Sequence, residues 1–175
     1  MRRFTRLLAA VAVFLAASSA RAEEPKKAEH AGLERLKKLA GTWVAADEEG
    51  KPTENVVSVF KVTAAGSAVQ ETIFPGAPHE MVTLYHLDGG KLMLTHYCAL
   101  GNQPKLVADP KSPKGSLKFD FVGGTNFDPA KDMHMHEGTI KFIDADTIEW
   151  SWVGYDKGEP QTDHQVDLKL IRKKD

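Results

Sequence analysis

The sequence has 175 residues, a formal net charge of −1 and one cysteine. That length suits one domain with its own core, and a nearly neutral chain without a basic stripe argues against nucleic acid or an anionic membrane surface as a partner. A single cysteine, Cys98, cannot form an internal disulfide, so the fold must depend on its packed core.

The first residues are typical of a secretory signal peptide. Met1–Arg6 is basic, Leu7–Ala17 is apolar but too short to span a bilayer, and Ala20–Ala22 is a small-x-small cleavage site. We therefore predict a signal peptide at 1–22 and an exported, periplasmic or extracellular protein that is not inserted in the membrane after cleavage. Because residues 1–22 hold four arginines and no acid, the 23 basic side chains fall to 19 against 24 acidic ones, a net charge of −5.

A short helix is predicted next. Residues 23–30 are charged and contain a proline, which indicates a flexible lead-in. Ala31–Leu39 then has leucines at helical spacing, and Gly41 provides a stop. We expect this helix to plug one end of the single domain formed by 31–175.

After Gly41 the pattern changes to short runs of alternating apolar and polar residues, separated by turn residues such as Asp88-Gly89-Gly90. Ten closely spaced strands with no helix between them predict an all-β fold, an antiparallel up-and-down meander. Closing the meander into a barrel removes its exposed edges. The strands are predicted at 42–46, 54–63, 67–74, 80–87, 91–98, 105–109, 116–122, 132–143, 147–155 and 163–171.

The clearest hairpin covers 132–155, with a tight turn at 144–146. Pairing across this turn predicts an apolar inner face and a polar outer face. By period-two alternation, His134 and His136 fall on the inner face. The facing pairs on that inner face are Phe142 with Ile148, Ile140 with Trp150, and Gly138 with Trp152.

Meander topology puts the longer loops at one end, which we interpret as the mouth of the barrel. Two histidines at i and i+2 on a strand can share one metal ion, and His96 can add a third nitrogen, which is a known zinc arrangement. The alternative is that these histidines line the cavity wall, hydrogen-bonded to loop groups or water. Cys98 is either a soft ligand beside His96 or a small buried hydrophobe. The inward residues near the mouth are His96, Cys98, His134, His136, Trp152 and His164.

Aromatic side chains on the inner face can grip an apolar ligand, or fill the core as small barrels require. Asn102 and Gln103, in a loop at the mouth, can orient a ligand through their amides or satisfy the loop's own backbone. Motifs of hydrolases, phosphate-binding loops and dinucleotide sites are absent, so no catalytic residue is predicted and the question of catalysis stays open. The residues predicted to bind a ligand are Tyr85, His96, Asn102, Gln103, Trp150, Trp152 and His164.

Gly41-Thr42-Trp43, after a short helix, is similar to the Gly-x-Trp opening of lipocalins and related calycin barrels. In that family the tryptophan closes the barrel floor near an arginine from the last strand, and Arg172 matches that arginine here. The resemblance covers the whole chain after the leader. Leu92–Cys98 together with Gly101–Pro104 also looks like a signature of a group of exported bacterial lipocalin-like proteins, which implies no known activity.

Ten strands and an inward histidine near the end of the chain also resemble nitrobindin-type haem-binding barrels. The resemblance implies that His164 ligates haem iron. The chain departs from that family at Val44–Asp47, where those barrels carry a glycine-rich run.

These observations together predict an exported lipocalin-like barrel that binds a small, largely apolar ligand at its open end. The alternative is a metal- or haem-binding barrel that uses the mouth histidines, with zinc or another transition metal as the first candidate and with possible hydrolytic or redox activity.

Overall fold

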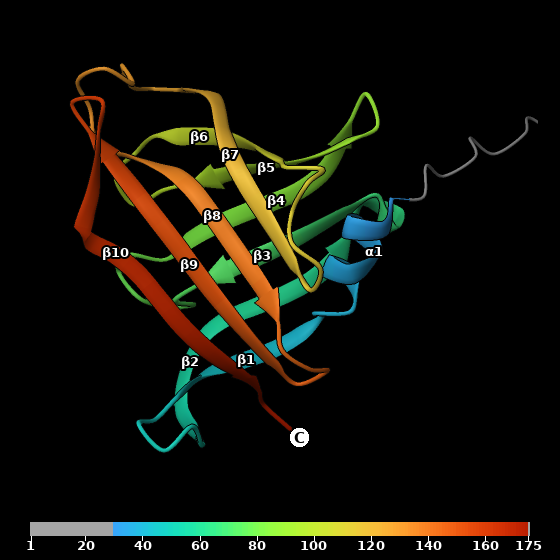
Figure 1. The fold of residues 1–175 in the computed structure, drawn as a ribbon. Coiled ribbons are helices and arrows are strands. Elements are labelled where there is room, and N and C mark those ends of the chain that lie inside the picture. The colour runs from blue at the N-terminus through green and yellow to red at the C-terminus, as the bar shows by residue number, and fades with distance from the viewer. Residues whose placement is uncertain (1–29, 175) are drawn as a thin grey trace, which may run out of the picture.

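The computed structural model describes residues 30–174, apart from the side chain of His164. A short helix is followed by ten antiparallel strands that close into a barrel (Figure 1). The predicted signal peptide (1–22) and all but the last residue of the predicted lead-in (23–30) lie outside the described residues. Within the described part, no helix is long and apolar enough to cross a membrane.

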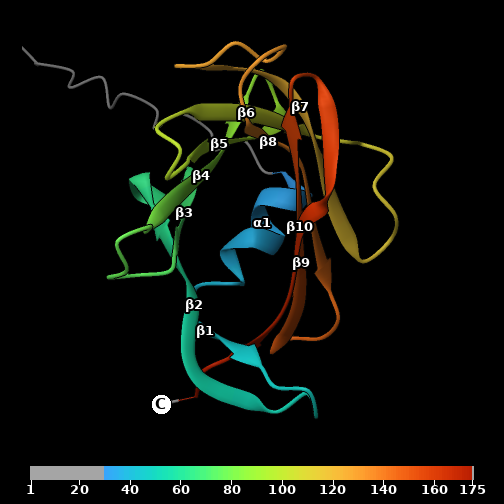
Figure 2. The same cartoon turned by 90° about the vertical axis from the view of Figure 1, so that its left-hand side faces the viewer.

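The all-β meander is confirmed, with element ends that differ from the prediction by a few residues. Each strand pairs with the strands before and after it, and β10 pairs with β1 to complete the ring, which Figure 2 views along the barrel. The elements are α1 Ala31–Lys37, β1 Gly41–Ala46, β2 Pro52–Thr63, a 3-10 turn Ala64–Gly66, β3 Ala68–Ile73, β4 Met81–Asp88, β5 Lys91–Tyr97, β6 Gln103–Ala108, β7 Ser116–Thr125, β8 His134–Phe142, β9 Thr147–Asp156 and β10 Glu159–Arg172.

The turn between β4 and β5 shows how local chemistry fixes the register. Gly89 and Gly90 have φ angles of 53° and 82°, in the left-handed region that glycine adopts without strain. This two-residue turn pairs Asp88 with Lys91. Because side chains alternate along a strand, the register of the turn decides which residues of β4 and β5 face the interior.

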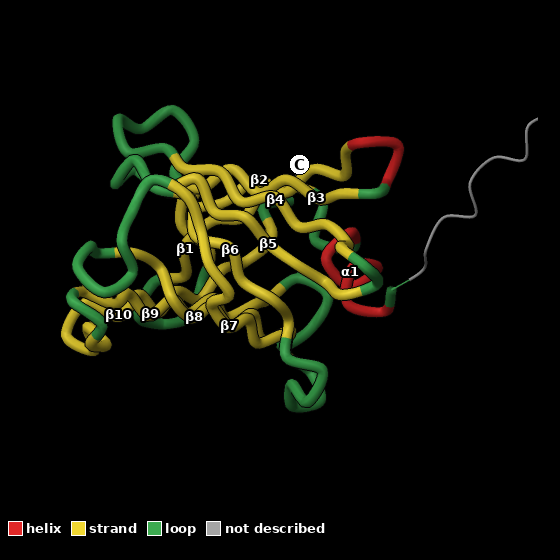
Figure 3. Tube along the Cα trace, turned by 90° about the horizontal axis from the view of Figure 1, so that it is seen from above, coloured by secondary structure: helices red, strands yellow, loops and turns green. Residues whose placement is uncertain are grey.

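The helix α1 lies at one end of the barrel, near the β4–β5 turn and the β6–β7 loop (Figures 1 and 3). Its Leu33 and Leu36 are buried in the barrel core. Arg35 donates to the Ser116 carbonyl and lies over the Phe142 ring at 4.0 Å. The helix therefore contacts the β7 and β8 side of the ring as well as the core, while its role as a plug stays a prediction.

The core is one cluster of buried apolar side chains that α1 and strands all around the ring contribute. Such a continuous interior is what inward alternation on every strand produces. Its members are Leu33, Leu36, Leu39, Trp43, Val57, Phe60, Val69, Tyr85, Leu92, Leu94, Leu106, Leu117, Phe119, Ile140, Ile148, Trp150, Trp152 and Leu170.

Trp43 and Arg172 meet where β1 pairs with β10. The Trp43 indole is fully buried and donates from Nε1 to the Leu39 carbonyl at 2.8 Å. The Arg172 guanidinium carbon lies 4.5 Å from the centre of the Trp43 ring, within cation–π range. This is the packing that the Gly-x-Trp resemblance led us to expect.

Candidate functional site

The barrel interior contains a cavity of about 90 Å³ in the half toward the β3–β4 loop. Its wall is almost entirely apolar and includes both Trp150 and Trp152. Apart from the indole N–H groups of Trp150 and Trp152, only Ser58, Glu71 and His96 among the described lining residues carry polar side-chain nitrogen or oxygen atoms. The lining residues are Val57, Ser58, Glu71, Ile73, Phe74, Met81, His96, Met135, Trp150, Trp152, Val166 and Leu168.

Glu71 is a buried carboxylate on the inner face of β3, with no exposed surface. Its Oε1 accepts hydrogen bonds from Ser58 Oγ at 2.7 Å and Trp150 Nε1 at 2.9 Å, and its Oε2 accepts one from Tyr85 OH at 2.7 Å. Burial raises the pKa of Glu71 above its ordinary value of 4.5, and the three donors act in the opposite direction. Burial and the neighbouring carboxylate also raise the pKa of Tyr85 well above 10.0.

Sequence reasoning missed Glu71, although a signal was present. Val69 and Ile73 flank it at period two and are both buried, so regular alternation puts Glu71 on the inner face. Tyr85 and Trp150 are both predicted to bind a ligand, but their polar atoms donate hydrogen bonds to this carboxylate. They touch the interior mainly as apolar and aromatic surface.

His96 on β5 is the second polar group in the cavity wall. Its ring is 2 % exposed, and Nδ1 forms a 2.9 Å hydrogen bond with Thr83 Oγ1 of β4. Burial lowers the pKa of His96 to about 4, so the ring is neutral at pH 7. The ring centre lies 5.1 Å from that of Trp152, which in turn lies 4.5 Å from that of Trp150.

Gly138 on β8 makes room for the two indoles. A Cβ atom there would come within 3.1 Å of the Trp150 ring and 3.2 Å of the Trp152 ring. Both distances are tighter than ordinary van der Waals contact, so any side chain at this position pushes the rings out of place. The predicted pairing of Gly138 with Trp152 is confirmed.

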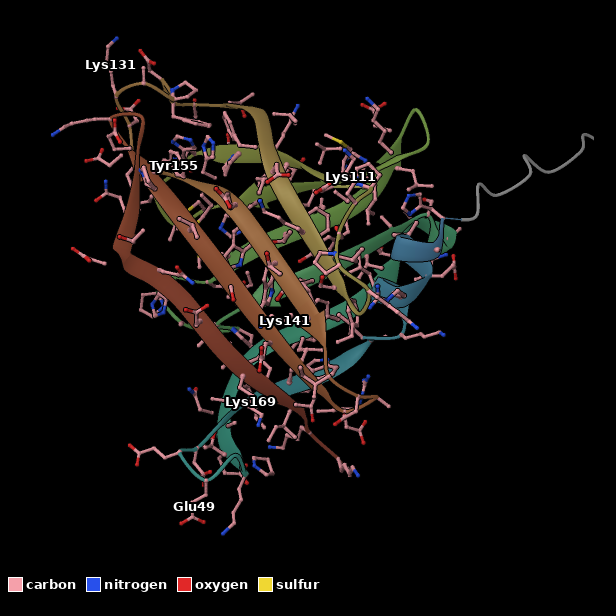
Figure 4. The ribbon with its side chains drawn as sticks, viewed as in Figure 1. Glu49, Lys111, Lys131, Lys141, Tyr155 and Lys169 are labelled. Atoms are coloured by element: carbon pink, nitrogen blue, oxygen red, sulfur yellow. The ribbon has the colours of Figure 1, made fainter. Side chains whose placement is uncertain are left out.

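The prediction that regular alternation continues to His134 is wrong, because β8 contains a bulge. Pairing with β9 shifts register between Met135 and Glu137, which leaves His136 as the extra residue. Met135 takes the position opposite Gly154 and lines the cavity. His134 lies opposite Tyr155, which Figure 4 labels on β9 at the end of the barrel that carries Lys131.

The two histidines form a pair of their own at this bulge. His134 is fully buried, and its Nδ1 bonds to the Asp132 carbonyl at 2.9 Å while its Nε2 lies 2.9 Å from His136 Nδ1. The His136 ring stacks on Tyr155 with centres 3.8 Å apart and on Phe121 with centres 4.6 Å apart. Burial, then His134, lowers the pKa of His136.

The predicted three-histidine metal set is not brought together. His96 bonds to Thr83 and packs on Trp152, whereas both ring nitrogens of His134 are engaged at the bulge. In the part of the chain that the structure describes, no three His, Cys, Asp or Glu side chains are grouped so that they could hold a metal ion. Cys98 is half-buried, and burial raises the pKa of its thiol.

His164, the predicted haem ligand, lies in β10, and its side chain is outside the described residues. The pairing of β10 with β9 shifts register between Gln161 and Val166, the segment that contains His164. Haem ligation by His164 stays a prediction.

Asn102 and Gln103 form hydrogen bonds within and between the loops at the predicted mouth. Asn102 is 4 % exposed and donates from Nδ2 to the Met133 carbonyl at 2.8 Å, which ties the β5–β6 loop to the β7–β8 loop. Gln103 donates to the Gly101 carbonyl and accepts from the Thr125 hydroxyl. Asn102 Nδ2 and the Gln103 amide satisfy the loops, whereas Asn102 Oδ1 is buried with no hydrogen-bond partner among the described residues. A role of these amides in orienting a ligand stays a prediction.

We compared the chain with models of known protein families and with curated proteins, and neither comparison returned a match.

Proposed function

We propose that this chain is an exported lipocalin-like barrel that binds a small, largely apolar ligand in the cavity beside Trp150 and Trp152. The observation that carries the proposal is the apolar cavity of about 90 Å³ inside a closed barrel. Apolar cavities of about 150 Å³ stay dry and take up molecules such as benzene. The cavity here is smaller, so a ligand of about six heavy atoms or fewer fits it without rearrangement of the wall.

Flexible side chains in the wall support a somewhat larger ligand. Met81 and Met135 both line the cavity, and unbranched thioethers adapt to the shape of what they contact. Small rearrangements of these two side chains widen the cavity without disturbing the strands that hold Glu71 and His96.

Two further features support the lipocalin-like and exported parts of the proposal. The stacking of Arg172 on Trp43 agrees with the Gly-x-Trp opening of lipocalins. The basic, apolar and small-residue segments of 1–22 agree with an export signal.

The proposal is tested by filling the cavity. Ile73 lines it and is 7 % exposed, while Thr72 is its neighbour on the other face of β3. Methylenecyclohexane should bind the natural protein and Thr72→Trp with similar affinity, as followed by tryptophan fluorescence and calorimetry. Ile73→Trp should weaken binding by at least about tenfold, because the indole occupies the space of the ligand. Equal binding by Ile73→Trp and Thr72→Trp, with both variants folded, would rule out the cavity as the site.

A second candidate is a weak transition-metal contact through His136 alone, since no three ligand side chains are grouped in the described part of the chain. The Asp132 carbonyl can only accept a hydrogen bond, so His134 Nδ1 carries the hydrogen. When the His134 ring is neutral, its Nε2 has no hydrogen and accepts a hydrogen bond from His136 Nδ1. His136 Nε2 is left with its lone pair, and an anchored Nδ1–H is typical of metal-binding histidines. Equilibrium dialysis with Zn²⁺ tests this: His136→Gln should lose the bound zinc and His86→Gln should keep it. Retention by His136→Gln would exclude the candidate.

A further inference from the structure

We infer that the ligand of this cavity is uncharged and carries one hydrogen-bond acceptor, such as a carbonyl or ether oxygen, which His96 recognises through Nε2–H. The inference rests on the proposed function and names the chemical class of the ligand. It follows from how His96 is anchored and from what the rest of the wall lacks.

The anchoring of His96 leaves one ring nitrogen for the cavity. Nδ1 is held by Thr83 on the neighbouring strand, and the ring packs at a tilt against Trp152, another wall residue. Among the described residues, the bond to Thr83 is the only hydrogen bond that the ring forms. Nε2 is therefore the atom through which His96 can form a hydrogen bond with a ligand.

The hydrogen-bond partners of Thr83 decide which nitrogen carries the proton. Thr83 is fully buried, and its hydroxyl has no other hydrogen bond in the described part of the chain. If Nδ1 carried the hydrogen, the Thr83 hydroxyl hydrogen would be buried without an acceptor, which is unfavourable. If the hydroxyl donates to Nδ1 instead, both groups are satisfied, and a neutral ring then carries its hydrogen on Nε2. The cavity thus presents a donor and selects an acceptor.

The rest of the wall disfavours a charged ligand. No lysine or arginine is among the described lining residues, so an anion would be buried without a counter-charge. Glu71, the one acidic side chain among the described lining residues, already receives three hydrogen bonds on its two oxygens. An ammonium group has only donors and cannot pair with Nε2–H. The lowered pKa of His96 keeps the ring itself neutral at pH 7.

Two probes of the same shape test the inference in the full-length protein. Cyclohexanone carries an acceptor oxygen where methylenecyclohexane carries a CH₂ group. His96→Phe should weaken cyclohexanone binding by about tenfold, the worth of one hydrogen bond, and leave methylenecyclohexane binding unchanged. His86→Phe, in β4 and outside the described wall, is the matched control and should alter neither affinity. Cyclohexanecarboxylate and cyclohexylammonium should both bind at least about tenfold more weakly than cyclohexanone.

The outcomes separate the inference from the proposed function. If His96→Phe changes both neutral probes equally, or if cyclohexanecarboxylate binds as tightly as cyclohexanone, the inference is overturned while ligand binding stands. If neither neutral probe binds the natural protein, the proposed function fails and the inference fails with it.

A measurement on the natural protein covers the case in which His96→Phe does not fold. In ¹⁵N-histidine NMR, His96 should carry its proton on Nε2, and that signal should shift with cyclohexanone but not with methylenecyclohexane. A proton found on Nδ1 would overturn the inference, because Nε2 would then be an acceptor.

Discussion

At the scale of single residues, Glu71 stands out because it is the buried one among the described acidic side chains. It is an acid with no exposed surface, and its oxygens face two hydroxyls and one indole N–H. Burial favours the protonated form and the three donors favour the carboxylate, with burial the larger of the two effects. The carboxyl group therefore links β2, β3, β4 and β9 through Ser58, Tyr85 and Trp150.

We predict that Glu71→Leu destabilises the protein by about 3 kcal/mol or more, because it leaves three buried donors without an acceptor. Glu71→Gln keeps an oxygen for Ser58 and Trp150 but leaves the buried Tyr85 hydroxyl hydrogen without an acceptor, so it should cost about 1–3 kcal/mol, less than Glu71→Leu. Urea unfolding of both variants measures the difference. Equal losses in the two variants would contradict the role given to the hydrogen bonds.

The same residue predicts a pH dependence. The folded-state pKa of Glu71 is raised, so between 4.5 and that raised value the folded chain keeps a proton that the unfolded chain has lost. Its contribution to stability is then greatest below pH 4.5 and declines as the pH rises through this window. Glu71→Gln cannot titrate, so the free energy of unfolding of the variant should rise relative to the natural protein from pH 4.5 to pH 8. A constant difference across this range would contradict the raised pKa.

At the scale of elements, the bulge in β8 decides which side chains reach the cavity. One extra residue, His136, reverses the alternation, so Met135 enters the wall and His134 pairs opposite Tyr155. Beyond the bulge, the pairs from Gly138 to Phe142 follow the predicted register. Tight turns and regular alternation made the hairpins predictable, since both are local properties of the sequence.

The bulge and the Glu71 cluster were not predictable in the same way. A bulge depends on which residues the neighbouring strands offer, here the aromatic set of Phe121 and Tyr155 that receives both histidine rings. The partners of Glu71 lie up to 79 residues away in the chain. Such contacts follow from the closed barrel and have no local sequence signal.

Cysteine accessibility tests the reversed alternation. In a Cys98→Ala background, Met135→Cys should react slowly with a thiol reagent, because the position faces the cavity. His136→Cys should react faster, since His136 does not line the cavity. The two residues are equally half-buried, so the comparison tests which way each side chain points. Equal rates, or the opposite order, would mean that regular alternation holds at this end of β8.

At the scale of the whole molecule, Arg172 joins the two ends of the barrel sequence. Its guanidinium donates to the carbonyls of Lys38, Ala40 and Ala145 and to the carboxylate of Asp146. One side chain thus connects the helix end, the start of β1 and the β8–β9 turn to the last strand. These bonds stabilise the seam at which the ring closes.

We predict that Arg172→Ala lowers the free energy of unfolding by about 2–4 kcal/mol, through lost hydrogen bonds and the lost stacking on Trp43. Arg172→Lys should recover less than half of this loss, because an ammonium group cannot reproduce the planar fork of a guanidinium. Lys173→Ala removes an exposed ion pair with Glu54 and should change stability by no more than about 0.5 kcal/mol. Thermal and urea unfolding of the three variants give the comparison. If Arg172→Lys were as stable as the natural protein, only the positive charge of Arg172 would contribute to stability.

The seam between β1 and β10 also has a consequence for the time course of folding. Ala40 and Arg172, which it brings together, are 132 positions apart in the chain. Every other strand pair joins neighbours in the chain, so hairpins can form one after another as the polypeptide emerges, but the ring cannot close before β10 is available. Contacts of such long range are slow to form, because a large loop must be ordered before the contact stabilises it. Until β10 pairs with β1, the sheet has two free edges at which other chains can add.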